Sequence, residues 1–394
     1  MTKLLSKTAS LAVSLIQKHS ITPNDLGCQD LVRARLENVN FKCLTLKDSG
    51  TENLLALHGE GSPFFLFLGH TDVVSPGDES AWAVPPFEAL IDDKGVLHGR
   101  GSQDMKGSDA AMTEALVSFV EHNPHHKGTV GILLTSNEEG DAKGGTPFVV
   151  EYLKKKNLIP DYCLVGEPSC SNTFGDTIKN GRRGSLTAHI TVNGIQGHVA
   201  YPDRCDNAAH HAGVLISRLF SKKWDEGSKF FPPSSFQVTN IKCGTGAENV
   251  VPGSCYIMCN WRFNDALSKD KISIEVEKII RELELNCEIR YVLEYSFIAF
   301  SLSAFDTLSN MSNLELILSA VSLEKSIVEV TGNKALLSTA GGTSDGRFVA
   351  PLGTKVVEFG PVSNLIHKVN ESVELDSLDK LHEVYVKTLN DLFR

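Results

Sequence analysis

The run "FFLFLGH" (residues 64–70) is apolar until its last residue, and "GILLTSNEEG" (131–140) likewise passes from apolar to charged side chains. "YCLVGE" (162–167) and "KVVEFG" (355–360) repeat this pattern. Short apolar runs of this kind are typical of strands buried on both faces of a parallel sheet, with helices in the segments between them. They predict an α/β domain whose mostly parallel sheet is flanked by helices.

A different pattern interrupts this domain. From about Gly184 the apolar periodicity predicts strand, helix, strand, strand, helix and strand, and the α/β pattern then resumes. The order βαββαβ is that of a ferredoxin-like domain. We therefore expect a discontinuous catalytic domain formed by residues 1–182 and 295–394, with an inserted domain at residues 183–294.

Local signals also predict where one early helix begins. In "ITPNDLGCQDLVRARL", Thr22 is a suitable N-cap and Pro23 suits the first helical position. Asp25 would favour the positive end of the helix dipole. The sequence thus predicts a helix that starts directly after Thr22.

Composition excludes several classes of partner. The net charge of −10 over 394 residues argues against a nucleic-acid groove or an anionic membrane surface. No apolar run approaches the ~18 residues of a membrane span, and the first residues fit an amphipathic helix better than a signal peptide. The nine cysteines form no CxxC pair, which favours reduced thiols in a cytoplasmic protein.

Polar side chains gather at or just beyond the predicted strands. In an open α/β sheet the carboxyl ends of the strands meet at one crevice, so residues distant in sequence can assemble there. Each of these residues alone has an ordinary structural explanation, but two histidines with several carboxylates are together the ligand types for zinc or a similar divalent ion, in sufficient number for two ions. They are His70, Asp72, Asp104, Glu138, Glu139, Glu167 and His367.

The motifs that contain these residues resemble those of a known family. "GHTDVV", "GRGSQDMKG", "SNEEG", "VGEPS" and "IHKVNE" are similar, in content and order, to the motifs of the dinuclear zinc aminoacylase and carboxypeptidase family. The likeness runs from residue 70 to residue 371. The stretches "GDTIKNGRRGSL", "QGHVAYP", "ENVVPG" and "TAGGTSDGRF" resemble the branch of that family that removes succinate from an N-succinylated diamino acid.

The resemblance implies two divalent metal ions per subunit, zinc with cobalt as the alternative. His70 and Glu167 would bind one ion, His367 and Glu139 the other, and Asp104 would bridge them. Asp72 would hold the His70 imidazole. Glu138 would be the general acid/base that takes a proton from the attacking water and passes it to the leaving amine.

The resemblance also implies a homodimer formed through the inserted domain. In that family a histidine at the place of His198 reaches the active site of the partner subunit and stabilises the oxyanion. Without the resemblance, His198 in "QGHVAYP" would be taken for an ordinary loop residue.

The implied substrate is N-succinyl-LL-2,6-diaminopimelate, a small molecule with three carboxylates and one ammonium group. Arginine forks and backbone donors can bind such carboxylates, so the expected contacts are Arg183, Asn249, Arg262 and Thr343. Arg182 is an alternative to Arg183. Where the family often has Asn-Ala-Thr-Ile-His before the last ligand, this chain has Ser363-Asn364-Leu365-Ile366-His367, which leaves open whether Ser363 or Asn364 contacts substrate.

Two rival interpretations remain at this point. A relative with the same two-metal chemistry could act on acetylornithine or a dipeptide instead, although "DTIKNGRRGS" favours the succinylated substrate. A catalytically inactive relative would use the fold for binding or regulation. Its mark would be the loss of a metal ligand or of the base, and this chain retains all of them.

Overall fold

The computed structural model describes residues 4–228, 231–295, 298–299 and 320–393. The chain forms two compact units. The large unit contains Met1–Asn180, Phe300–Ser338 and Thr343–Arg394. The small unit contains Gly181–Ala299 and the short stretch Thr339–Gly342.

An eight-stranded mixed sheet runs through the large unit, in the order β1-β2-β6-β3-β7-β18-β8-β17. Its central strands β6, β3, β7 and β18 are parallel, whereas β1 and β2 are antiparallel additions at one edge. The four apolar runs of the sequence are these central strands, which confirms the α/β fold. The bounds are β1 Lys42–Asp48, β2 Thr51–Glu60, β3 Phe64–His70, β6 Gly128–Thr135, β7 Tyr162–Val165, β8 Thr177–Lys179, β17 Leu336–Ser338 and β18 Lys355–Glu358.

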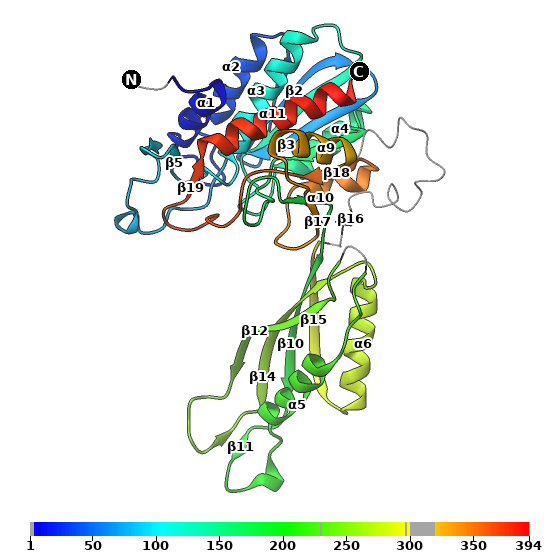
Figure 1. Cartoon of the computed structure of the whole chain (residues 1–394). Helices are drawn as coiled ribbons and strands as arrows, with labels where there is room; N and C mark the ends of the chain where they lie inside the picture. The colour runs from blue at the N-terminus through cyan, green and yellow to red at the C-terminus, as the bar shows by residue number, and fades with distance from the viewer. Residues whose placement is uncertain (1–3, 229–230, 296–297, 300–319, 394) are drawn as a thin grey trace. The chain divides into compact units, whose positions relative to one another are not determined.

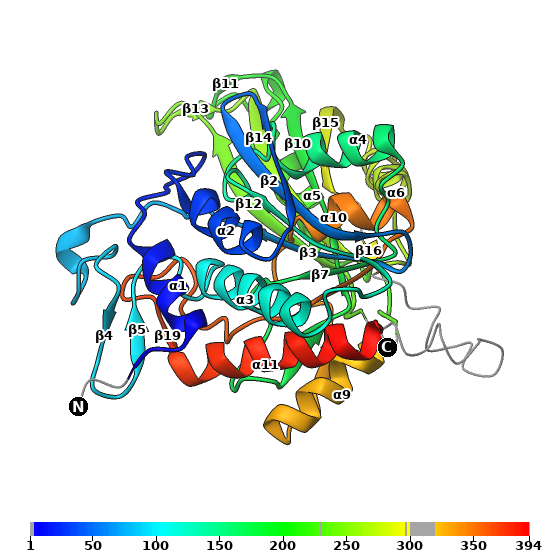
Figure 2. The same cartoon turned by 90° about the horizontal axis from the view of Figure 1, so that it is seen from above.

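Helices cover both faces of this sheet. Figure 2 shows α3 and α11 side by side on one face, with α1 and α9 next to them, and α4 and α10 on the other face. A three-stranded sheet, β19-β5-β4, lies at one end. The bounds are α1 Lys7–Ile16, α2 Cys28–Glu37, α3 Lys106–His122, α4 Thr146–Lys156, α9 Ala320–Thr331, α10 Gly346–Val349, α11 Leu375–Leu392, β4 Leu90–Ile91, β5 Val96–His98 and β19 Ser372–Glu374, with 3₁₀ turns at Glu79–Ala81 and Ala350–Leu352.

The last helix shows how the apolar pattern produces this packing. Leu378, Leu381, Tyr385 and Leu389 of α11 recur at helical spacing and are all fully buried. The Tyr385 hydroxyl donates to the Phe359 carbonyl at 2.6 Å, so its polar end is also matched. Within the described residues, no helix is both long and apolar enough to cross a bilayer.

The predicted start of the early helix is wrong. Helix α2 begins at Cys28, and its N-cap is Gly27 with φ of 86° rather than Thr22. The Thr22 amide instead donates to the Val73 carbonyl, which keeps this segment beside the chain that follows β3. Asp25 accepts hydrogen bonds from the amides of Gly27 and Gln29. This acidic residue therefore does interact with the start of the helix, but it lies before the helix rather than in its first turn.

The small unit is built around an antiparallel sheet in the order β12-β14-β10-β15. Helices α5 and α6 pack on one face of it (Figure 1). This order and the βαββαβ sequence of elements are those of the predicted ferredoxin-like fold. The bounds are β9 Gly181–Arg182, β10 Gly184–Asn193, β11 Gly197–His198, α5 Ala208–Ser221, β12 Ser235–Cys243, β13 Val250–Val251, β14 Ser254–Phe263, α6 Lys269–Glu282, β15 Asn286–Tyr295 and β16 Ile298–Ala299, with a 3₁₀ turn at Pro202–Arg204.

Candidate metal centre

Strand register brings the polar segments of the large unit to one edge of its sheet. His70, the last residue of β3, pairs with Thr135, the last residue of β6. Leu68 of β3 pairs with Val165 at the end of β7. The chain therefore leaves three adjacent parallel strands at the same level, and Glu138, Glu139 and Glu167 follow within a few residues.

One cluster forms around His70. Its Nε2 atom lies 3.5 Å from Oδ1 of Asp104 and 3.8 Å from Oε1 of Glu167. Ligand atoms of His70, Glu138 and Glu167 all lie within 4.8 Å of one another. Only 2% of the His70 side chain is exposed, so this imidazole is fixed by packing at the strand end.

A second cluster forms around His367. Its Nε2 atom lies 3.1 Å from Oδ2 of Asp104 and 3.0 Å from Oε1 of Glu139. The two oxygens of Asp104 therefore face different imidazoles, Oδ1 towards His70 and Oδ2 towards His367. This is the orientation that a carboxylate bridging two cations requires.

Asp72 links the two clusters in a way that the sequence did not reveal. The Nδ1 atom of His70 lies 2.9 Å from the backbone carbonyl of Asp72 and 3.6 Å from its carboxylate. The Asp72 carboxylate accepts the backbone amide of Glu138 at 3.2 Å on one oxygen and that of Glu139 at 3.1 Å on the other. Asp72 thus holds the imidazole through its main chain and the two glutamates through its side chain.

The carboxylates of the two clusters favour a positive charge on the histidines or on a ligand bound beside them. Burial alone disfavours a charged His70, but contacts with Asp104, Asp72 and Glu138 outweigh it and raise the pKa of His70 well above its usual value. Hydrogen bonds to Asp104 and Glu139 raise the pKa of His367 to about 10. Burial raises the pKa of Glu167 well above its usual value, and the charges of Asp104 and Glu138 add to this effect.

These features fit a pair of divalent cations. Oδ1 of Asp104 is buried and, among the described residues, accepts no hydrogen bond, which leaves a carboxylate oxygen available to a ligand. The imidazoles and carboxylates are hard or borderline donors of the kind that zinc and related ions prefer. A cation at each imidazole would offset the repulsion from Asp104 and Glu138, which adds to the effect of burial on the pKa of Glu167.

Glu138 differs from Glu139 in its surroundings. Burial, with the nearby charge of Asp345, raises the pKa of Glu138 to about 8. Glu139 instead contacts His367 directly. The Asp345 carboxylate accepts a hydrogen bond from Thr146 at 2.6 Å, and its other oxygen is buried with no hydrogen-bond partner among the described residues. The adjacent glutamates therefore have different environments, as different roles would require.

The remaining predicted site residues lie outside these clusters. Thr343, in the large unit, is partly buried. In the small unit, Arg183 is partly buried and Asn249 is exposed, while Arg262 lies in β14 opposite Ser185. Because the two units are described separately, the contacts predicted for Arg183, Asn249 and Arg262 stay predictions.

His198 is exposed at the end of β11. Its Nδ1 atom accepts the backbone amide of Ala200 at 3.1 Å. A neutral imidazole that accepts at Nδ1 carries its proton on Nε2. The local structure therefore prepares His198 as a donor at Nε2, which is the role that an oxyanion would demand of it.

The residues of the two alternatives that the sequence leaves open make local hydrogen bonds. Arg182 is buried and donates to the Ala340 carbonyl at 3.2 Å, whereas Arg183 is more exposed. Ser363 donates to the Cys170 carbonyl, and the side-chain oxygen of Asn364 accepts from Gln103. Both Ser363 and Asn364 thus have structural partners within the large unit.

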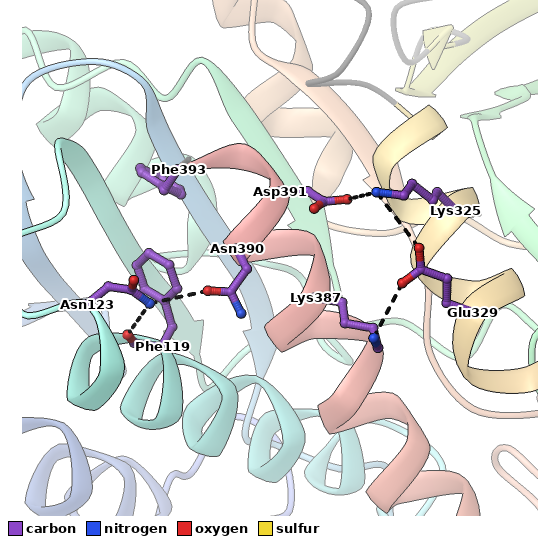
Figure 3. Close-up of a pocket in the computed structure, with 8 residues that line it drawn as sticks. All are labelled: Phe119, Asn123, Lys325, Glu329, Lys387, Asn390, Asp391 and Phe393. Carbon is purple, nitrogen blue, oxygen red and sulfur yellow. Dashed lines mark hydrogen bonds and ion pairs between the residues drawn. The ribbon is translucent and has the colours of Figure 1, made fainter.

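A hollow elsewhere on the large unit is a poor site for an anionic substrate. It lies among α3, α9 and α11 (Figure 3), and its lysines are paired with acidic neighbours. Lys325 contacts Asp391 at 2.9 Å, and Lys387 contacts Glu329 at 3.3 Å. Its charges therefore neutralise one another.

Sequence reasoning missed two residues that support the clusters. Glu371 lies within the quoted motif "IHKVNE", and Gln103 within "GRGSQDMKG", but neither was given a role. Glu371 accepts the Asp104 amide at 3.1 Å, and Gln103 contacts the segment before His367. No spacing rule could have found these contacts, because their partners are more than 260 positions apart.

Comparison with known proteins places the whole chain among metal-dependent hydrolases. A profile of peptidase family M20/M25/M40 matches residues 66–391. The chain is 45% identical over 392 residues to the succinyl-diaminopimelate desuccinylase of Hahella chejuensis, covering 100% of this chain and 98% of that protein. It is 46% identical to the protein of the same name from Pseudomonas syringae pv. syringae, covering 98% and 99%.

Solved structures share the fold at low sequence identity. The aminopeptidase PepT of Bacillus cereus aligns with a TM-score of 0.75 at 16% identity, covering 98% of each chain. A dinuclear metal-binding peptidase of family M20 from Bacillus subtilis aligns with a TM-score of 0.69 at 12% identity, also covering 98% of each chain.

Proposed function

The chain belongs to peptidase family M20/M25/M40, and we propose that it hydrolyses the amide bond of N-succinyl-LL-2,6-diaminopimelate to succinate and LL-2,6-diaminopimelate. This reaction is a step in diaminopimelate and lysine biosynthesis. The observation that carries the proposal is the identity of about 45% to desuccinylases over nearly the full length, in a chain that keeps a complete donor set at its strand ends.

The two clusters support the metal assignment that we propose. His70 and Glu167 would hold one ion, His367 and Glu139 the other, with Asp104 shared between them. Zinc fits this donor set, and cobalt is the alternative. When bound, the two ions would supply Lewis-acid stabilisation of the carbonyl oxygen and lower the pKa of water.

Glu138 moves the proton in this proposal. Its carboxyl lies within 4.8 Å of the ligand atoms of His70 and Glu167, next to the proposed ions, where it can accept a proton from water and release it again. It takes a proton from the attacking water and delivers it to the amide nitrogen as the C–N bond breaks. Asp72 fixes the positions of Glu138 and Glu139 by accepting a hydrogen bond from the backbone amide of each.

Substrate binding is assigned to the predicted donors. Arg183 and Arg262 would each grip a substrate carboxylate with a planar fork, and Asn249 and Thr343 would donate to the remaining polar groups. Arg182 is less suited to this role because it is buried against Ala340.

A homodimer would complete the site, with His198 of each chain supplying Nε2–H to the oxyanion in the other. The surface that favours self-association is the edge strand β12 together with α5, where Ile241, Val214 and Phe220 are exposed by 54%, 50% and 71%. An edge strand flanked by apolar side chains is suited to pair with a second copy. Sedimentation should give a dimer, and Ile241→Asp should shift it towards monomer.

Parallel assays of three substrates test the function. With zinc added, turnover of N-succinyl-LL-2,6-diaminopimelate should greatly exceed that of acetylornithine and of a dipeptide. Dominant activity on either alternative would refute the substrate assignment. We also propose a cytoplasmic location, which the nine cysteines outside disulfides and the biosynthetic reaction support.

A further inference from the structure

A single buried carboxylate organises the segment that carries Asp104. Glu371 is fully buried. One of its oxygens accepts from the Arg100 guanidinium at 2.7 Å and the Gly101 amide at 3.1 Å. The other accepts from the amides of Gln103 at 2.9 Å and Asp104 at 3.1 Å. Two donors on each oxygen fix the course of the chain from Arg100 to Asp104.

The Gln103 side chain makes the reciprocal connection. Its oxygen accepts the Leu365 amide at 2.9 Å. Its nitrogen donates to the Asn364 side chain at 3.0 Å and to the Ser372 carbonyl at 2.9 Å. The segment that carries His367 is therefore tied to the Asp104 segment on both sides of the histidine, by Asn364 and Leu365 before it and by Glu371 and Ser372 after it.

These ties matter because packing fixes His367 only weakly. Half of its side chain is exposed, and its backbone has φ of 60°, in the left-handed region that is uncommon for residues other than glycine. The distance of 3.1 Å between His367 and Asp104 therefore depends on how their two segments are held together.

The other metal position is fixed differently. His70 is the end of a buried strand, and its Nδ1 atom is held by the Asp72 carbonyl at 2.9 Å. Glu167 follows β7, the neighbouring strand. Loss of the ties around Glu371 would leave these two residues in place.

We infer that Glu371 is a positioning residue that sets the spacing between Asp104 and His367, and thereby the affinity of the metal position that they share with Glu139. This inference rests on the proposed two-metal centre. Outer partners of metal ligands typically change metal affinity by about 10–100-fold when they are removed. Here the larger change falls on the ion at His367, because the ion at His70 keeps His70 and Glu167 and is affected only through the shared Asp104.

Glu371→Gln tests the inference with metal content as the readout. Whichever way the amide turns, its NH₂ group replaces an oxygen that accepts two hydrogen bonds, so the segment must shift. Equilibrium dialysis over a range of free zinc should give two ions per wild-type chain. The variant should bind the ion at His367 about 10–100-fold more weakly, and the ion at His70 should lose distinctly less affinity.

Glu374→Gln is the matched control, because it removes the same charge from an exposed glutamate three positions further on. It should bind both ions as the wild type does. Gln103→Ala removes the hydrogen bonds between Gln103 and Asn364, Leu365 and Ser372, and it should lower the affinity for the same ion. This second variant keeps the inference testable if Glu371→Gln does not fold.

Unchanged affinities for both ions in Gln103→Ala and Glu371→Gln, or an equal fall for both ions, would overturn the positioning role. If the wild-type chain itself held fewer than two ions, the two-metal centre would fail and the inference with it. Two ions bound at the wild-type affinities in both variants would remove this inference alone.

Discussion

Asp72→Asn tests the contacts of the Asp72 carboxylate with Glu138 and Glu139 without removing the contact of its backbone carbonyl with His70. The variant keeps the backbone carbonyl that contacts His70 and changes only the side chain. Asparagine offers one acceptor to two amide donors that lie 3.2 and 3.1 Å from the carboxylate oxygens. One amide then faces an NH₂ group, and the other loses the assistance of a negative charge.

The magnitude follows from these two contacts. An unmatched buried donor costs about 1–3 kcal/mol, and exchanging a charged for a neutral acceptor costs about 1 kcal/mol more. The total of about 2–4 kcal/mol should divide between stability and positioning of Glu138. If half of it raises the barrier, turnover falls about 5–30-fold. The melting temperature should fall by roughly 4–8 °C at about 2 °C per kcal/mol if most of it acts on stability.

Turnover and thermal unfolding should be measured together, with excess zinc present. Asp93→Asn is the control, because Asp93 is exposed and the change removes the same charge. A surface change of this kind should stay within about 0.5 kcal/mol of the wild type. If Asp72→Asn keeps turnover within twofold and melting within about 1 °C, its carboxylate does not position the glutamates.

The other predictions concern the base, one ligand, the dimer and pH. Glu138→Gln should keep both metals but lose about 10²–10⁴-fold in turnover, and near-normal rates would refute the acid/base role. Glu139→Gln should lower metal occupancy in dialysis, and unchanged content would mean that the two glutamates are assigned the wrong way round. His198→Ala should lose activity and keep its metals, and mixing it with Glu138→Gln should restore part of the activity; no recovery despite proven subunit exchange would exclude action across the dimer. His58 and His126 share a ring hydrogen bond of 2.8 Å, and burial lowers the pKa of both. Their neutral forms therefore stabilise the fold above about pH 6.5, and this contribution is lost as the pH falls below it, so wild-type melting should drop more than that of His58→Gln between pH 7.5 and 5.5.

The sequence was sufficient to predict the central strands, because a strand buried on both faces must be apolar throughout and its polar successors stand out. It was also sufficient to predict that His70 and Glu167 lie at one edge of the sheet, since His70 ends one such strand and Glu167 comes shortly after another. The roles of these residues remain predictions until metal content and activity are measured.

The helix start and the supporting contacts could not be obtained in the same way. Thr22 and Pro23 form a good local start signal, but the Thr22 amide bonds to Val73, so a tertiary contact overrides the local preference. The role of Glu371 depends on amides brought to it by the fold rather than on any motif spacing. Sequence motifs identify residues whose role depends on their neighbours in the chain. They miss residues whose role depends on contacts with a segment that is distant in sequence.

The Glu371 contacts also determine when the centre can assemble during synthesis. Glu371 lies 271 positions after Arg100. At a ribosome speed of about 5–20 residues per second, the Arg100 segment is made roughly 15–55 s before its acceptor exists. A nascent chain that stops short of Glu371 would therefore contain Asp104 and Glu139, which we propose as metal ligands, but not the carboxylate that fixes the first of them. In this proposal, full metal affinity should arise only after Glu371 has been made, which would keep shorter nascent chains from holding zinc tightly.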